Sequence, residues 1–327
     1  MNPIFYISSE RSGTNFFRNF IHAHSKGYFP HNPSIYEDFK PLEHLYGSKE
    51  EFVFDVIGLV KFNHDPWDYI PEEEEVVKRL SKICSLEITK VIYELCAEHY
   101  QVSHVGIKNV RFANQIDQIY ETYDNPKFIY QYRDARDCAA SWLSINSGPK
   151  HVYHAAKRWN DEQNDVKAVM DQLNANGDLI QFSYEELVTD AEGMMRKVCS
   201  FLGMEFEEQM LEFHKSKAAK KSATMHKAWN NLAKPIMTNN FNKFESKLSP
   251  DQIKIIEGVA GPNMVRLGYQ LKNVEYEVSA ESFAPNLIES YNEINEQLRK
   301  ENFEKSDRNY RKERKDQYRK SVKNKFI

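Results

Sequence analysis

The sequence contains few cysteines, only 4 in 327 residues, and none of them forms a C-x-x-C pair. Cys84 and Cys96 fall in an expected helix about three turns apart, too far from each other for a disulfide. We therefore expect free thiols, as in proteins of a reducing compartment. The His, Cys, Asp and Glu residues show no spacing typical of a metal site, so no metal is expected.

Long hydrophobic runs are also missing. No stretch approaches the ~20 apolar residues that cross a bilayer. The first apolar run, Ile4–Ile7, begins almost at Met1 and leads directly into a polar loop, which leaves no room for a signal peptide. These absences predict a cytoplasmic protein with no membrane span.

The chain also lacks a large excess of either charge. Its net charge of −4 by itself predicts no binding partner. The charge is unevenly spread, however, with 12 Lys/Arg against 5 Asp/Glu from Arg299 to the C-terminus. Hydrophobic residues are plentiful at 41%, including 20 Phe and 18 Tyr. This content is enough for a sizeable core and excludes a disordered or fibrous chain.

Short apolar runs alternate with longer amphipathic stretches, which predicts βα units around a parallel sheet. The irregular segment Gly27–Pro71 is expected to be either the substrate-facing part of the protein or plain surface loop. Strands are expected at Pro3–Ser8, His104–Lys108, Lys127–Tyr132 and Leu179–Ser183. Helices are expected at Asn15–His24, Val76–His99, Cys138–Ile145, His151–Leu173, Ala191–Leu202 and Pro250–Ala260.

The strongest local signal is a strand, polar loop and helix near the N-terminus. The helix N-terminus that follows such a loop presents unpaired backbone N–H groups and the positive end of the helix dipole, which attract an anion. Ser12, Thr14 and Asn15 add side-chain donors, Arg11 adds a fixed charge, and Gly13 permits close approach of the backbone. An ordinary strand–helix turn is the alternative.

The loop differs from a Walker sequence, which requires G-x-x-x-x-G-K-[ST]. With Gly13 on the second glycine, Ser8 takes the place of the first glycine and Thr14 that of the lysine. A nucleoside triphosphate is therefore a poor fit. A phosphosulfate, with less charge and no required magnesium, fits better.

A second anion site is expected after the third strand. Arg133 follows the strand at its C-terminal end, where α/β sheets place their ligands, and Ser141 lies on the next helix. An arginine with a hydroxyl is a natural clamp for a phosphate. Alternatively, Asp134 and Asp137 pair with Arg133 and Arg136.

These motifs resemble those of sulfotransferases that use 3′-phosphoadenosine 5′-phosphosulfate (PAPS). Arg11-Ser12-Gly13-Thr14 is similar to their 5′-phosphosulfate loop, and Arg133-Asp134-x-Arg136-Asp137 with Ser141 is similar to their 3′-phosphate motif. Further similar segments are Tyr184-Glu185-Glu186-Leu187, Phe201-Leu202-Gly203 and, more weakly, Leu267-Gly268-Tyr269 at the usual domain end. The resemblance implies a P-loop NTPase-like, three-layer α/β/α fold with a central parallel sheet over residues 1–272. A charged, helical C-terminal extension over residues 273–327 would follow.

The resemblance also implies roles for single residues. Arg11–Asn15 would hold the 5′-phosphosulfate, Arg133 and Ser141 the 3′-phosphate, Tyr184 would lie near the adenine, and Lys234 would close over the cofactor. Arg11 stands where hormone- and phenol-type enzymes carry Lys, so the chain looks closer to the bacterial and carbohydrate- or protein-directed branch. Asn15 replaces a frequent second Thr and changes the reach of that donor.

Sulfuryl transfer needs an in-line acceptor, positive charge on the bridging and leaving oxygens, and a base. Lys108, in the place of a family K-T/N segment, either adds charge or points into solvent. Related enzymes take the base from a His soon after that segment or from a Glu about twenty residues beyond the first loop. Asn109 excludes the first arrangement. His31 is the first choice because of its pKa range, with a packing role as its alternative, and Glu37 is the second choice.

The main hypothesis is an enzyme that transfers a sulfuryl group from PAPS to a hydroxyl or amine of a small-molecule or carbohydrate acceptor and releases PAP. A small-molecule or nucleotide kinase is the first alternative, which the missing Walker lysine disfavours. A non-enzymatic binder of anions or nucleic acid through the basic tail is the second, which the acidic residues of the tail disfavour. A tail packed against a second subunit of a homo-oligomer also stays open.

Overall fold

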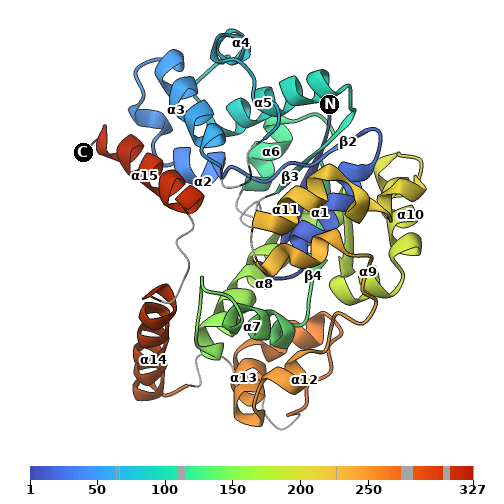
Figure 1. Cartoon of the computed structure of the whole chain (residues 1–327), viewed down its shortest axis with the longest axis vertical. Helices are drawn as coiled ribbons and strands as arrows, with labels where there is room; N and C mark the ends of the chain where they lie inside the picture. The colour runs from blue at the N-terminus through green and yellow to red at the C-terminus, as the bar shows by residue number, and fades with distance from the viewer. Residues whose placement is uncertain are drawn as a thin grey trace.

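A computed structural model of the chain describes residues 1–63, 65, 67–108, 115–225, 227–273, 283–304 and 310–326. In this part of the chain, five parallel strands form a sheet in the order β2-β3-β1-β4-β5, with helices on both sides (Figure 1). The strands are β1 Asn2–Ser8, β2 Gly27–Tyr28, β3 His104–Lys108, β4 Lys127–Tyr132 and β5 Leu179–Ser183. The predicted parallel sheet is confirmed, and the short strand β2 is the addition to it.

Helices occupy most of the remaining described residues. The first eight are α1 Thr14–Ala23, α2 Ile35–Phe39, α3 Lys49–Lys61, α4 Glu73–Arg79, α5 Ser85–Tyr100, α6 Ile116–Thr122, α7 Ala135–Leu143 and α8 Val152–Ala175. The others are α9 Tyr184–Thr189, α10 Ala191–Leu202, α11 Lys217–Met225, α12 Phe244–Lys247, α13 Pro250–Arg266, α14 Pro285–Glu304 and α15 Tyr310–Asn324. Short 3-10 helices are η1 Glu43–Leu45, η3 Glu208–Met210, η4 Phe213–Lys215 and η5 Lys227–Ala233.

The central strand β1 shows why helices cover both faces of the sheet. Successive side chains of a strand point to opposite faces, and four consecutive residues of β1 are almost fully buried. Phe5 and Ile7 pack with side chains of α3, α5, α6 and α8, whereas Ile4 and Tyr6 pack with those of α1 and α10. The chain therefore has the expected three-layer α/β/α architecture.

Two expectations about the helices are wrong. Val76–His99 was expected as one helix but forms α4 and α5, because the carboxylate of Glu87 accepts the N–H of Ser81 at 2.6 Å and interrupts the helical hydrogen bonding there. Gly27–Pro71 was expected to be irregular but contains β2, α2 and α3. Helix α3 begins after Ser48, whose hydroxyl accepts the N–H of Glu51 and caps the helix.

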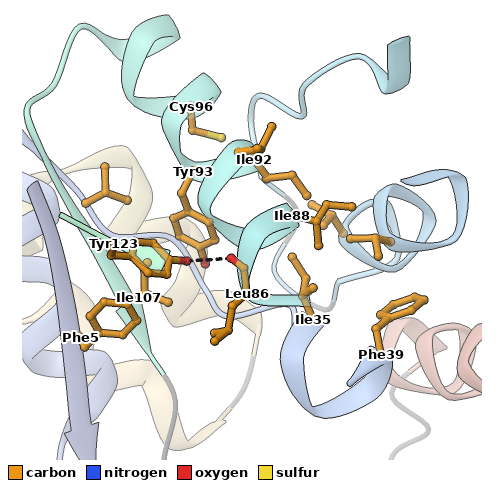
Figure 2. Close-up of a cluster of buried hydrophobic side chains, with 14 of the residues drawn as sticks. Phe5, Ile35, Phe39, Leu86, Ile88, Ile92, Tyr93, Cys96, Ile107 and Tyr123 are labelled. Atoms are coloured by element: carbon orange, nitrogen blue, oxygen red, sulfur yellow. Dashed lines mark hydrogen bonds between the residues drawn. The ribbon is translucent and has the colours of Figure 1, made fainter. Parts of the chain in front are cut away.

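Helix α2 joins the largest buried cluster, beside the carboxyl ends of β1 and β3. Figure 2 shows Ile35 of α2 facing side chains of α5, with Phe5 and Ile107 from the sheet nearby. Tyr123 closes this cluster, and its hydroxyl donates to the Leu86 carbonyl at 3.2 Å. The core thus places α2 close to the edge of the sheet where parallel strands end.

The two C-terminal helices pack on different parts of the protein. In α14, Tyr291 stacks on His151 at 4.3 Å, and the Asn295 side chain accepts the N–H of Lys150 at 2.8 Å. Helix α15 packs on α3 and lies beside α2 (Figure 1). The division between a domain ending at residue 272 and an extension stays a prediction. Over the described residues, no helix combines the length and the apolar character required to span a membrane.

Candidate active site

The candidate site lies where three neighbouring strands end. Strands β3, β1 and β4 are adjacent and parallel, so the residues after them meet at one edge of the sheet. Lys108 ends β3, the loop after Ser8 follows β1, and Arg133 follows β4. The fold therefore brings together the residues of both predicted anion sites.

The loop after β1 has a conformation that requires glycine. Gly13 has φ 89°, and a Cβ at this position would lie 2.5 Å from the ring of Tyr184. The Ser9 and Ser12 hydroxyls are 2.8 Å apart, and the Gln131 side-chain amide donates to the Ser12 carbonyl. The first contact lies within the loop, and the second attaches the loop to strand β4.

The start of α1 leaves its amides available. Within the described residues, the N–H groups of Gly13, Thr14 and Asn15 donate no backbone hydrogen bond outside α1 itself. These groups and the positive end of the helix dipole point out of the helix N-terminus. These donors are arranged as the sequence predicts for an anion site.

Arg11 connects the two predicted anion sites. Its Nε donates to the Ser141 hydroxyl at 3.1 Å, and its carbonyl lies 3.5 Å from Nη1 of Arg133. Its guanidinium lies 5.8 Å from the centre of the Trp142 ring. Burial lowers the pKa of Arg11 from its usual value. Arg11 thus lies beside both Arg133 and Ser141.

Arg133 is nearly buried and only partly neutralised. Its Nη2 donates to Asp137 at 2.9 Å and to the Asn240 carbonyl at 3.0 Å. Its buried Nε has no hydrogen-bond partner within the described part of the chain. The guanidinium also lies 4.2 Å from the centre of the Tyr184 ring. Arg133 therefore keeps one covered donor, Nε, without a hydrogen-bond partner among the described residues.

The alternative in which the aspartates pair with both arginines is also present in the structure. Besides the pair of Arg133 with Asp137, Arg136 contacts Asp134 at 2.6 Å and Glu257 at 2.7 Å. Arg136 is thereby fully engaged in joining α7 to α13. Pairing with Asp137 leaves Arg133 beside Arg11, so this alternative and a phosphate site are compatible.

Asn240 contacts two of the predicted site residues, and the sequence analysis missed it. Its side-chain amide donates to the Tyr184 hydroxyl at 2.6 Å, while its carbonyl accepts from Arg133. Lys243 in turn contacts the Asn240 side chain. Lys234, the predicted closing residue, lies exposed at the start of the same segment. No motif marks Asn240, because it follows an irregular stretch far along the chain.

Lys108 faces the first loop and a small pocket. Its Nζ donates to the Thr14 hydroxyl at 3.2 Å, and burial lowers its pKa from the usual value. Glu37 lines the same pocket. The other lining residues are Phe5, Asn32, Ile35, Tyr36, Leu86, Thr89, Tyr93, Ile107 and Tyr123. The pocket is mainly apolar and opens beside the loop.

His31 is buried and held by several groups. Its Nε2 lies 2.9 Å from Oδ2 of Asp65, and its ring stacks on Trp229 at 4.8 Å. Burial alone would raise the pKa of Asp65, but the hydrogen bond from His31, with the charges of His31 and Arg18, lowers it to about 2. His31 thus forms a tight pair with Asp65, which the sequence analysis missed. Asn109, which the sequence analysis also considers, lies outside the described residues.

No group of three or more His, Cys, Asp or Glu side chains within the described ranges could hold a metal ion. The donors at the site are instead amides, hydroxyls, arginines and a lysine. This set is suited to binding anions.

Comparison with known proteins decides the family. The sulfotransferase family model matches residues 3–208, which include the loop, the Arg133 segment and Tyr184. The chain belongs to the sulfotransferase family. The predicted sulfotransferase family is therefore confirmed.

Individual relatives are distant. A Caenorhabditis briggsae protein named as a candidate protein-tyrosine sulfotransferase is 26% identical over 195 residues, covering 56% of this chain and 66% of its own length. An uncharacterized protein of Aquifex aeolicus (strain VF5) is 23% identical over 259 residues, covering 76% of this chain and 31% of its own length. The chain thus spans less than two thirds of these relatives.

Two solved structures share the fold. The sulfotransferase domain of the curacin biosynthetic pathway has a TM-score of 0.57 at 16% identity and covers 83% of this chain and 98% of its own. The sulfotransferase domain of the Synechococcus PCC 7002 olefin synthase has a TM-score of 0.55 at 19% identity and covers 78% and 94%. The predicted sulfotransferase fold is confirmed.

Proposed function

We propose that this sulfotransferase uses PAPS as its donor and transfers the sulfuryl group to a hydroxyl or amine of a small-molecule or carbohydrate acceptor. The observation that carries the proposal is the convergence of Arg11, Arg133, Ser141 and Lys108 on the loop before α1. PAPS supplies the sulfuryl group: the acceptor atom forms a bond to sulfur in line with the bond that breaks, and PAP leaves with that electron pair.

The first loop fits the 5′-phosphosulfate. The amides at the start of α1 and the hydroxyls of Ser12 and Thr14 offer donors, and Arg11 and Lys108 add positive charge. Positive charge and fixed donors stabilise the leaving oxygen best when they are held in place before the reaction. Contacts of Arg11 with Ser141 and of Lys108 with Thr14 hold both side chains there.

The Arg133 segment fits the 3′-phosphate. The unpartnered Nε of Arg133 is a buried donor, which is costly unless a ligand pairs with it. Ser141 lies within the same group of contacts through Arg11. Tyr184 packs against both Gly13 and Arg133, so the residue that the resemblance places near the adenine borders both predicted anion sites.

Two residues compete for the role of base. Glu37 lines the same pocket as Lys108, beside the loop that would hold the sulfuryl group. The His31 ring is occupied by Asp65 and Trp229. This geometry supports Glu37 as the group that accepts the acceptor proton, and His31 as a residue that keeps the neighbouring loop in place.

The cavity encloses only about 20 Å³, so it would have to widen to admit an acceptor, and its lining favours one with an apolar body. Its walls include Ile35, Leu86, Tyr93 and Tyr123, all of which are buried. The hydroxyl groups of an oligosaccharide would find few polar partners there. A hydroxyl or amine at the polar end of the pocket would face Glu37 and Lys108.

The test is transfer of labelled sulfate from PAPS to a panel of phenols, alcohols, amines and sugars. We expect labelled product with at least one acceptor class and a loss of at least 100-fold in Arg11→Ala, because that variant loses charge at the leaving oxygen. Lys320→Ala, on the exposed face of α15, should retain the wild-type rate. Phosphorylation of the same panel from ATP, without sulfate transfer, would contradict the proposal and support the kinase alternative.

A further inference from the structure

Arg319 of α15 and Lys325, just after the helix, make ion pairs with the body of the protein. Arg319 donates to Asp38 at 2.7 Å, at the end of α2. Lys325 contacts Asp55 of α3 at 2.5 Å, and the Tyr318 hydroxyl donates to the Asp55 carbonyl at 3.1 Å. Figure 1 shows α15 lying along these two helices. These charges are therefore paired inside the molecule.

Lys315 extends this contact to the loop that holds His31. Lys315 is only 5% exposed, although it is a lysine on a C-terminal helix. Its Nζ donates to the Asn63 side chain at 3.2 Å, and Asn63 donates to the His31 carbonyl at 3.3 Å. A chain of two hydrogen bonds thus connects α15 to the backbone of His31.

Apolar packing holds α15 in place between these polar contacts. Val322 is 3% exposed and belongs to the same core cluster as Phe39 and Leu59. The Tyr318 ring rests against Gly58, where a Cβ would overlap the Tyr318 hydroxyl. This contact is a packed interface, not a loose association of charges.

We propose that α15 is a positioning element of the acceptor side of the active site, acting through Lys315 and Arg319. The segment between these two contacts, residues 31–39, carries His31 and Glu37 and contributes Ile35 to the acceptor pocket. Helix α2 has only five residues, too few to be stable without packing. Contacts from α15 therefore fix the position of this pocket wall relative to the first loop. The catalytic part of this inference rests on the proposed function.

Hydrogen exchange on the full chain tests the structural part. The amides of Asp38 and Lys40, which donate to the carbonyls of Ser34 and Tyr36, report on α2. In Lys315→Met and Arg319→Gln we expect these amides to exchange at least tenfold faster, while the strands stay protected. Lys320→Met removes a charge from the exposed face of the same helix and should change exchange less than twofold.

Rescue variants separate positioning from general loss of structure. Arg319→Lys keeps a donor for Asp38 and should exchange like wild type. Arg319→Glu should expose α2, and adding Asp38→Lys should restore its protection. Unchanged exchange in Arg319→Gln, or faster exchange throughout the chain, would overturn the proposal.

Two activity measurements keep this inference distinct from the proposed function. PAP affinity, measured by calorimetry, should stay within twofold in all the α15 variants, because Arg133 lies on the other side of the first loop. With an acceptor from the sulfate-transfer panel, Lys315→Met should raise KM for the acceptor at least fivefold and leave KM for PAPS unchanged. An equal change in both KM values would contradict a role on the acceptor side.

Absence of PAP binding in the wild type would contradict the proposed function, while hydrogen exchange would still decide the role of α15.

Discussion

At the scale of single residues, the first loop depends on two positions in the left-handed region, Arg11 at φ 72° and Gly13 at φ 89°. A non-glycine residue in this region is uncommon and is maintained by its surroundings. Arg11 is held by Ser141 and Trp142, so its backbone strain is compensated by contacts of its side chain. Gly13 has no side chain and instead allows Tyr184 to approach the backbone.

Gly13→Ala tests how closely the loop is packed. Alanine at this φ costs about 1 kcal/mol, and its Cβ would overlap the Tyr184 ring, so we expect a total loss of about 2 kcal/mol in the free energy of unfolding. Denaturant unfolding of this variant measures the loss of stability, and titration with PAP measures the effect on the binding site. PAP affinity should fall at least tenfold, and unchanged affinity would contradict the placement of the phosphosulfate.

Glu37→Gln and His31→Gln distinguish the two candidate bases. Removing the base should lower kcat by about 100-fold or more, whereas a residue that only holds the loop affects kcat less. We expect the larger loss in Glu37→Gln, with PAP affinity unchanged, because Glu37 lines the pocket with Lys108. Transfer rates with an acceptor from the panel provide the measurement. A larger kcat loss in His31→Gln would make the pair of His31 with Asp65 the base.

The sequence predicts some of the residues at the candidate site and misses others, for a physical reason. Arg11, Gly13 and Ser141 lie in local motifs, where a strand leads directly into a loop and a helix. Asp65 and Asn240 reach the site from segments that are remote along the chain, and each contacts several residues through geometry that only the folded chain creates. Such contacts leave no spacing pattern to detect.

At the scale of elements, a buried ion-pair group attaches α7 to α13. Arg136 contacts Asp134 and Glu257, and Glu257 also accepts the N–H groups of Lys272 and Asn273. Since α7 carries Ser141 and begins next to Arg133, this group sets the position of the residues predicted for the second anion site.

Arg136→Met should therefore destabilise the protein strongly. Removing one member of a buried ion group leaves its partners uncompensated, at a cost of about 3–5 kcal/mol in the free energy of unfolding. Arg196→Met, which breaks an exposed pair with Glu192 on α10, is the matched control and should cost less than about 1 kcal/mol. Urea unfolding of both variants provides the comparison. Similar losses would show that the buried group does not anchor α7.

Helix α3 shows where prediction of elements from the sequence fails. Its capping signal, Ser48 followed by Glu51, is present in the sequence. However, the packed residues of α3 face two different neighbours. Val53 and Val56 pack in the core, while Gly58 contacts Tyr318 of α15. A helix covered on two sides loses the clean periodicity of a surface helix. Four strands were predicted to within one residue, and the two-residue strand β2 was missed. Burial on both faces gives β1 and β4 short, continuous apolar runs that the sequence shows.

At the scale of the whole molecule, the C-terminal helices belong to the folded body. The sequence shows a basic tail on an acidic chain, but it cannot show that Lys315, Arg319 and Lys325 meet polar groups of the first 65 residues. Burial lowers the pKa of Lys315 to about 8, with a further contribution from Arg319, while Asp38, Glu37 and Asp316 act in the opposite direction.

This pKa predicts how stability depends on pH. An unfolded lysine titrates near 10.5, so between pH 8 and 10.5 the unfolded chain binds more protons at Lys315 than the folded chain. The stability of the wild type relative to Lys315→Met should thus be constant below pH 8 and rise above it, by roughly 3 kcal/mol at most. Urea unfolding of both proteins at several pH values checks this. A flat difference would show that Lys315 is not buried by docking of α15.

The central claim is that this sulfotransferase binds the nucleotide of PAPS through the first loop and Arg133. Calorimetric titration of the wild type and of Arg133→Ala with PAP, and with ADP as the control ligand, tests it most directly. We predict micromolar PAP binding, weaker ADP binding, and a loss of PAP affinity of at least tenfold, about 1.4 kcal/mol, in Arg133→Ala. No PAP binding, or equal responses to PAP and ADP, would contradict the account.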